Sequence, residues 1–276
     1  MRGTGASLEA APPGAEAPAV DGDVVGANPT LVSNVETLAA VVPILGRGAE
    51  WHRSLGTPES AGVGICTVVG DVQHAGVAEI ELGESLRSVI DRVGGGPHPG
   101  RSVKAVLSGV STGAVHGRDL DVAVSYEALD AVGSGLGSLG FIVYDDTTDM
   151  VAVARMASRF LFVESCGQCP ACKFGTGEVT AYLDRIATNQ GVDHDIEMIE
   201  ARLTSVVDAN RCYLGTEEQR IVGSLLAKFP EDFVAHLEGA PAAERIPVPK
   251  IVDIADGVAT YDARQMRKRP DWTYAD

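Results

Sequence analysis

The spacing of apolar residues divides the chain into a strand-rich part and a helical part. In residues 61–148, short apolar runs are bounded by glycines and turn residues, which is typical of β-strands. These runs are GICTVVGDV, VAEIEL, VKAVLSGV and FIVYDD. One stripe of apolar residues at helical spacing, from Leu86 to Val93, follows Ser85, a residue type that caps helices. Strands around one helix predict a small α+β unit of β-grasp type.

From residue 149 to 239 the apolar period becomes helical. Successive stripes begin near Val153, Val179, Ile196 and Ile221, and they predict four amphipathic helices. Thr216 with Gln219 predicts a capping box that opens the fourth helix. Pro230 is expected to start a short helix that stops at Gly239. The fold class expected for the whole chain is α+β, a small β-grasp domain followed by a four-helix bundle.

The segments on either side complete the expected domain organisation. Residues 1–27 are rich in Gly, Ala and Pro and predict a flexible leader. Residues 28–60 predict a helix and a connector, with Ser33 and Glu36 as a capping box and Pro43 as its end or kink. In the tail, 240–276, IVDIADGVATYD predicts a hairpin, and RQMRKRP is a basic patch in an acidic chain.

Composition excludes several classes of function. The net charge of −16 argues against nucleic-acid binding, which needs a basic face. No apolar run is long enough to span a bilayer, so direct membrane insertion is not expected. The N-terminus has no apolar segment of a secretory signal. A cytoplasmic protein is expected, peripheral to a membrane at most through a complex.

Four of the five cysteines are concentrated between residues 166 and 212. ESCGQCPACKFGTGE places Cys166, Cys169 and Cys172 in a C-x2-C-x2-C run, which lets one loop wrap three corners of a cuboidal cluster. Cys212 follows at a distance that two helices would span. Thiolates are the usual ligands of iron–sulfur clusters, so the pattern predicts one [4Fe–4S] cluster. Gly167 and the stretch Gly175–Gly177 are expected to let backbone amides approach the sulfurs.

Other interpretations of these residue patterns fit less well. A structural zinc site also uses four cysteines, but usually as two separated pairs, whereas the spacing here is three plus one. Cys66 lies in an apolar strand and is expected to be a small buried residue. The glycines of AVGSGLGSLGFIVYDD form G-x-G-x-x-G, but a strand-like run follows where a dinucleotide site needs a helix. A loop before an edge strand is expected there.

Three stretches resemble a known family: PTLVSNVETLA, GSLGFIVYDD, and ESCGQCPACKFGTGE with a distant cysteine in NRCYLGTEEQ. They are similar to the flavoprotein subunit of NADH dehydrogenases, the 51-kDa or F subunit, with relatives in NAD-linked hydrogenases and formate dehydrogenases. The resemblance covers roughly residues 28–239. It implies a soluble-ligand-binding β-grasp (SLBB) domain over 61–148 and a helical iron–sulfur domain over 149–239. It also implies that Cys166, Cys169, Cys172 and Cys212 are the cluster ligands.

The resemblance further implies a flavin partner. The family's N-N-V-E-T segment lies beside the flavin; here Asn34 matches it, whereas Ser33 departs from it. The family's glycine-rich nucleotide segment is not found before residue 28, so FMN is expected to be shared with or supplied by another chain. The implied function is electron transfer from FMN through the cluster, within an NADH-dependent oxidoreductase built from flavin/NADH-binding and iron–sulfur subunits. The alternatives are a zinc-stabilised interaction module and an SLBB-type ligand-binding protein without a redox role.

Overall fold

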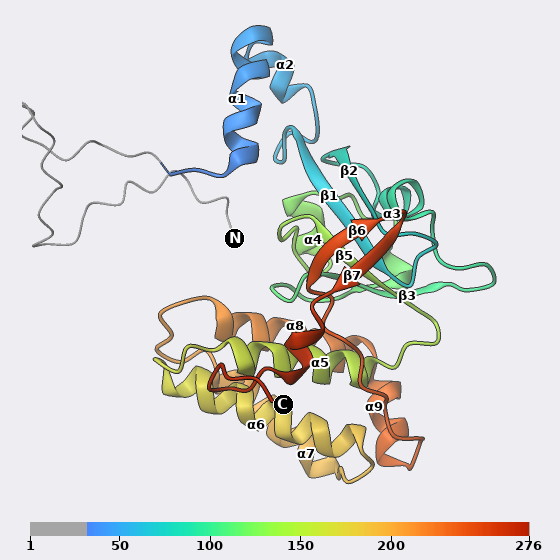
Figure 1. The fold of residues 1–276 in the computed structure, drawn as a ribbon, viewed down its shortest axis with the longest axis vertical. Helices are drawn as coiled ribbons and strands as arrows, with labels where there is room; N and C mark the ends of the chain where they lie inside the picture. Colours follow the sequence, from blue (N-terminus) through green and yellow to red (C-terminus); the bar gives the residue numbers. More distant parts are fainter. Residues whose placement is uncertain (1–31, 276) are drawn as a thin grey trace, which may run out of the picture. The chain divides into compact units, whose positions relative to one another are not determined.

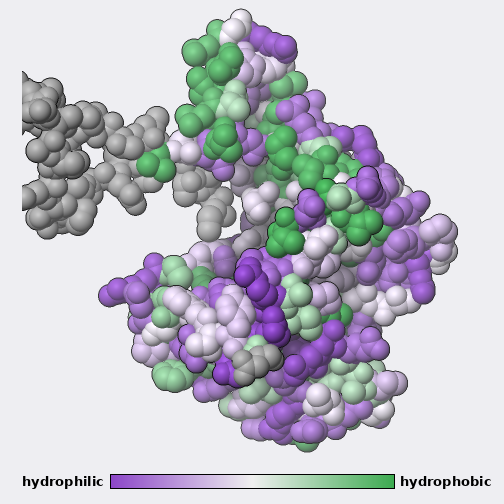
Figure 2. Space-filling view, viewed as in Figure 1, coloured by the Kyte–Doolittle hydropathy of each residue, from purple (hydrophilic) through white to green (hydrophobic). Residues whose placement is uncertain are grey.

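The computed structural model describes residues 32–275, and the chain divides into two compact units between Leu55 and Gly56 (Figure 1). The predicted leader, 1–27, lies outside the described residues. In the first unit, α1 (Val35–Arg47) is followed by α2 (Ala49–Arg53). Helix α1 buries none of its residues. Figure 2 shows the apolar side chains that it exposes, which include Val35, Val42 and Leu45.

Two expectations for α1 were wrong. The N-cap is Asn34 and not Ser33, because the Asn34 side-chain oxygen accepts a hydrogen bond from the Glu36 N–H at 2.8 Å. Pro43 does not end the helix, because it lies inside it and the helix continues to Arg47; a kink at Pro43 stays a prediction. A proline removes one backbone donor, and here residues on both sides of it are assigned to the helix.

The second unit contains a five-stranded sheet in the order β2-β1-β5-β3-β4. Its strands are β1 (Val63–Gly70), β2 (Gly76–Glu81), β3 (Val103–Ser108), β4 (Val115–His116) and β5 (Gly140–Asp145). Four of them were predicted, whereas β4 is too short to show a period. The glycine motif does lead into a strand, as expected, but β5 is central and not at an edge. It pairs in parallel with β1 and antiparallel with β3.

Both faces of the sheet are covered, because its strands carry apolar residues on each side. Cys66, Val68 and Val106 belong to the core on the side of α3 (Leu86–Gly94). Ser85 caps this helix as predicted, and its hydroxyl accepts from the Ser88 N–H. The short elements η1 (Gly117–Asp119) and α4 (Tyr126–Ala131) follow β4 along the chain. Alternate sheet residues such as Val69 and Leu107 belong to the core shared with the later helices.

The helices of the C-terminal half form a layer against that second face of the sheet (Figure 1). They are α5 (Met150–Glu164), α6 (Pro170–Ala187), α7 (Asp193–Ser205), α8 (Leu214–Lys228) and α9 (Pro230–Leu237). Pro230 opens α9 as predicted. The predicted capping box at Thr216 was wrong, because α8 already begins at Leu214, and its N-cap residue, Tyr213, makes no side-chain capping bond. The described residues therefore have a mixed α/β fold.

The tail contacts both the sheet and the helical layer: the Ala75 N–H donates to the Gly257 carbonyl of the tail at 2.6 Å, and the last residues of the tail lie against α5 (Figure 1). It contains the predicted hairpin, β6 (Ile251–Ala255) with β7 (Val258–Tyr261), and then η2 (Ala263–Arg267). The Lys268 ammonium contacts both carboxylate oxygens of Glu164 at the end of α5, at 2.7 and 2.8 Å. The Trp272 indole N–H donates to the Val163 carbonyl at 2.9 Å. Across residues 32–275, no helix has the length and apolar character needed to cross a membrane.

Candidate metal centre

The four clustered cysteines lie on two loops and one helix end of the second unit. Cys166 is in the loop after α5, Cys169 is the N-cap of α6, and Cys172 is in the first turn of α6. Cys212 is in the loop between α7 and α8. The pair Cys166 and Cys212 is exposed, Cys169 is half-buried and Cys172 is buried. All four thiols are free.

Arg211 joins the two loops. Its backbone N–H donates to the Cys169 sulfur at 3.4 Å, and its guanidinium Nη1 donates to the Gln168 side-chain oxygen at 3.1 Å. These contacts bring Cys212, the next residue along the chain, to the loop that carries the other cysteines. The structure therefore brings together the three-plus-one set that the sequence predicted.

Burial and the neighbouring thiols both act on Cys172. The pKa of the Cys172 thiol is raised, first by burial and then by the neighbouring Cys212, Cys169 and Cys166. The Ser165 hydroxyl lies 3.4 Å from the Cys172 sulfur and acts in the opposite direction. The neutral thiol is thus favoured at Cys172 until a positive centre binds, first because burial disfavours a thiolate and then because neighbouring thiolates repel each other.

Positive charge nevertheless faces this site from two sources. The N-terminus of α6, with Pro170 at its first position, directs unpaired backbone N–H groups toward the cysteine loop. The Lys173 ammonium donates to the carbonyl oxygens of Phe162 and Ser165 at 3.1 Å and of Pro270 at 2.8 Å. Lys173 interacts electrostatically with Cys172 and Cys166. Both features stabilise a negatively charged group held by thiolates.

Glycines inside the helices allow close packing beneath the site. A Cβ on Gly175 would lie 2.9 Å from the Val206 side chain, and one on Gly177 would lie 2.9 Å from the Phe162 ring. Both glycines lie within α6, so their role is helix packing and not the approach of amides to sulfur that the sequence predicted. Gly167, with φ of 76°, is the one that turns the cysteine loop itself.

The donor set fits an iron–sulfur cluster. Four thiols, the usual ligands of such clusters, converge beside a helix N-terminus and a lysine ammonium. Within the described range 32–275, no three His, Cys, Asp or Glu side chains are arranged to hold a metal ion. That observation concerns a single ion, because a cuboidal cluster holds its ligands farther apart than one ion does.

Comparison with known proteins agrees with this geometry. Residues 152–236, which include all four cysteines, match the family model described as the NADH-ubiquinone oxidoreductase-F iron-sulfur binding region. The chain belongs to the family of NADH dehydrogenase F subunits. It is 38% identical over 222 residues to the F 2 subunit of the NADH-quinone oxidoreductase of Rhizobium meliloti (strain 1021), covering 80% of this chain and 52% of that protein.

Two further relatives of this F-family chain come from hydrogenases. The NADP-reducing hydrogenase subunit HndC of Solidesulfovibrio fructosivorans is 36% identical, over 76% of this chain and 43% of that protein. A crystal structure of an NAD+-reducing [NiFe]-hydrogenase in the H2-reduced state superposes with a TM-score of 0.68 at 33% identity. That match covers 78% of this chain and 36% of the other. The chain spans about half the length of the curated relatives it matches.

The remaining residues singled out in the sequence of this F-family chain lie elsewhere. Asn34 caps α1 in the first unit. Cys66 is fully buried in β1, and burial raises the pKa of its thiol to about 12, which makes it unreactive, as expected of a packing residue. Ser165, Lys173 and Arg211 were not singled out as site residues. Their only sequence signal is that each adjoins or lies near a cysteine of the motif.

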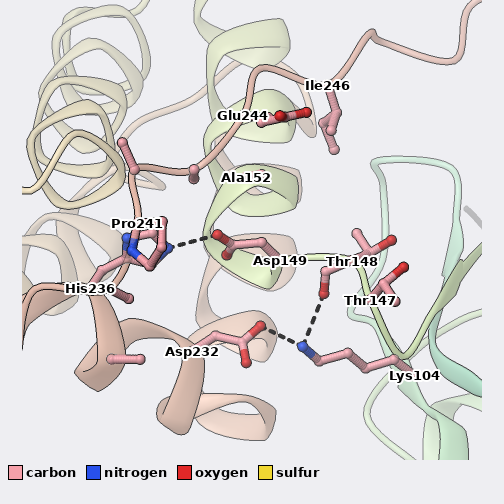
Figure 3. Close-up of a pocket in the computed structure, with 14 residues that line it drawn as sticks. Lys104, Thr147, Thr148, Asp149, Ala152, Asp232, His236, Pro241, Glu244 and Ile246 are labelled. Atoms are coloured by element: carbon pink, nitrogen blue, oxygen red, sulfur yellow. Dashed lines mark hydrogen bonds and ion pairs between the residues drawn. The ribbon is translucent and has the colours of Figure 1, made fainter.

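A cavity of about 530 Å³ lies between the sheet and α9 (Figure 3). None of the site residues predicted from the sequence lines it. Four of its charged or titratable side chains form two pairs. The Lys104 ammonium contacts Asp232 at 2.6 Å, and His236 Nε2 lies 2.7 Å from an Asp149 carboxylate oxygen. These pairs connect β3 with α9 and α9 with the start of α5. None of the four clustered cysteines contributes to this cavity.

Proposed function

We propose that Cys166, Cys169, Cys172 and Cys212 hold one [4Fe–4S] cluster, through which the chain relays electrons in an NADH-dependent oxidoreductase. The observation that carries this proposal is the convergence of four free thiols at the N-terminus of α6, inside the region that matches the family's iron–sulfur segment. When bound, the cluster supplies reversible one-electron transfer.

The residues of the chain would bind and tune that group. Three ligands come from one short loop and helix turn, and Arg211 holds the loop of the fourth ligand against it. The Arg211 N–H bond to the Cys169 sulfur and the Ser165 hydroxyl beside Cys172 withdraw charge from the ligands. The exposed pair, Cys166 and Cys212, marks the edge of the site that a redox partner can approach.

The domain organisation that fits this role is the one expected from the sequence. We propose a leader (1–27), a helix and connector (28–60), an SLBB-like β-grasp domain (61–148), a helical iron–sulfur domain (149–239) and a tail (240–276). The five-stranded sheet packed on α3 supports the β-grasp assignment. The packing of α5 with α6 and α8, and of α7 with α6, supports a four-helix bundle.

Electrons would enter from FMN and leave to a partner subunit. We propose that FMN is shared with or supplied by another chain, and that Asn34 contributes to its surroundings. The partners would be flavin/NADH-binding and iron–sulfur subunits, by analogy with relatives named as subunits of NADH-quinone oxidoreductase and of a hydrogenase. Five unpaired thiols support a reducing compartment such as the cytoplasm.

Electron paramagnetic resonance of the anaerobically reconstituted chain tests the proposal. Dithionite is expected to produce the signal of a reduced [4Fe–4S] cluster, and NADH alone is expected to produce none. The variant Cys212→Ala should lose the signal, and Cys66→Ala, which removes a thiol outside the site, should keep it. One bound zinc and no iron after reconstitution would refute the proposal and favour a zinc-stabilised module.

A further inference from the structure

Three arginines gather around one small cavity on the side of α5 that the tail covers. Arg155 and Arg159 lie one helical turn apart on α5, and Arg245 lies on the linker between α9 and the hairpin. The cavity measures about 40 Å³, and apolar side chains including Met156 and Val248 complete its wall. Figure 3 shows the neighbouring part of this linker, with Glu244 and Ile246 alongside α5 near Ala152.

Positive charge at this cavity exceeds negative charge. Its one carboxylate is Asp184, which lies 3.9 Å from Arg155 Nε and is 43% exposed. Arg155 is only 5% exposed. Burial lowers the pKa of both Arg155 and Arg159, and the positive charge of Arg245 lowers both pKa values further. The negative charge of Asp184 partly offsets this lowering at both arginines. Asp149 has the same effect at Arg155. Three guanidinium groups therefore face each other with incomplete neutralisation, in a chain whose net charge is −16.

Several N–H donors of these three arginines make no hydrogen bond within the described part of the chain. Arg155 donates through Nη2 to the carbonyls of Ala243 and Glu244, at 3.3 and 3.0 Å. Arg159 also donates through Nη2, to the carbonyls of Met266 and Lys268, at 3.2 and 2.9 Å. Within the described part of the chain, Arg245 makes neither a hydrogen bond nor an ion pair. A guanidinium carries five N–H donors, so most of the donors of this group are not used by the protein.

We propose that this cavity binds a single phosphate group, held by Arg155, Arg159 and Arg245. Guanidinium forks match the oxygens of a tetrahedral oxyanion in pairs, and a dianion would neutralise the excess charge. A water needs roughly 10–15 Å³ of such volume, so the cavity holds one small oxyanion and not a whole nucleotide. The group is either free phosphate or the phosphate of a nucleotide whose remainder lies outside.

The bound phosphate would fasten the tail to α5. Arg155 already holds the linker at residues 243–244, and Arg159 already holds the tail at 266 and 268. An anion between these side chains and Arg245 would join all three segments. This inference does not rest on the electron-transfer role, because it involves none of the cysteines.

Calorimetric titration of the full chain with inorganic phosphate, at fixed ionic strength in chloride, tests the site. We expect saturable binding of one phosphate per chain, weakened at least tenfold in Arg245→Gln. Among the described residues, this side chain makes no hydrogen bond or ion pair that the substitution would break. Arg159→Lys keeps the charge but loses the fork, and it should also weaken binding. The control, Arg118→Gln, removes an equal charge beside the sheet and should bind as the wild type does.

The outcomes separate the two sources of phosphate and can overturn the site. Adenosine monophosphate binding more tightly than inorganic phosphate would identify a nucleotide as the ligand, whereas equal or weaker binding would identify free phosphate. The proposal is wrong if the wild type shows no saturable phosphate binding. It is equally wrong if Arg245→Gln and Arg159→Lys bind as tightly as the wild type, or if Arg118→Gln loses as much affinity as they do.

Discussion

Glu218 provides the sharpest quantitative prediction, because it is a carboxylic acid buried in the middle of the helical layer. It lies on α8 with none of its surface exposed. The Ser158 hydroxyl of α5 donates to its Oε1 at 2.6 Å, and Thr180 of α6 lies 2.9 Å from that hydroxyl. The second carboxylate oxygen, Oε2, is buried and has no hydrogen-bond partner among the described residues. The charged form of this side chain is therefore poorly solvated.

Burial raises the pKa of Glu218 from 4.5 to about 8, against a smaller lowering effect of the Ser158 hydrogen bond. Between these two values the folded protein keeps a proton that the unfolded chain has released. The folded state then binds more protons, so the free energy of unfolding falls as the pH rises. Each pH unit costs about 1.4 kcal/mol, and the loss between pH 5 and pH 8 is on the order of 4 kcal/mol.

The substitution Glu218→Gln should remove this loss, because an amide of similar shape does not ionise. Urea unfolding followed by far-ultraviolet circular dichroism, at pH 5, 6.5 and 8, measures the effect. The stability difference between variant and wild type should shift in favour of the variant by about 4 kcal/mol from pH 5 to pH 8. Comparison at each pH cancels the titration of all other groups. Glu200→Gln, at an exposed position of α7, is the control and should show no such trend.

A difference between Glu218→Gln and wild type that stays constant from pH 5 to pH 8 would refute the reasoning. It would mean that Glu218 is ionised in the folded protein despite its burial. A trend of the same size in Glu200→Gln would also contradict it, since the effect would then not belong to the buried carboxyl.

Three further predictions concern the surroundings of the cysteines. Lys173→Met should lower the reduction potential of the reconstituted cluster by roughly tens of millivolts, because it removes a positive charge that favours the reduced form. Lys173→Arg keeps the charge and should stay near the wild-type potential. A redox titration followed by electron paramagnetic resonance measures both variants. Gly175→Ala should destabilise the fold by about 1–3 kcal/mol, because the new Cβ would clash with Val206. Gly223→Ala is the control and should not destabilise the fold, because its new Cβ would lie 3.8 Å from Leu203. Urea unfolding compares the two variants. Trp272→Phe should lower stability by about 1 kcal/mol, because the Val163 carbonyl loses its indole donor, and an unchanged unfolding midpoint would contradict this.

Local signals in the sequence were reliable where neighbouring residues alone determine the structure. Ser85 predicted the start of α3, Pro230 the start of α9, and the alternating run after Lys250 the hairpin. Two of the predictions that were wrong concerned the residue that caps a helix. Asn34 and Ser33 can both cap a helix, and Thr216 is a good cap that the structure places inside α8. The propensity of one residue does not decide such a choice.

The candidate site shows the same division. The residue types and the three-plus-one spacing of the cysteines were sufficient to predict a cluster-binding set. They did not reveal that Arg211 would connect the two cysteine loops by hydrogen bonds. They also did not reveal that the Lys173 ammonium would donate to the carbonyl of Pro270 in the tail. Those contacts join residues about 40 and about 100 positions apart, and no periodicity in a sequence encodes them.

By itself, the sequence determined the longer strands, the longer helices and the residue types of the four thiols, because these follow from short-range patterns and from residue type. Tertiary structure alone decided which groups surround those thiols and which are buried. The central place of β5, the buried acid at Glu218 and the three arginines under the tail all arise where distant segments pack together. Burial and like charges change the energy of a side chain only after packing has brought them together, so these properties become visible only in the folded chain.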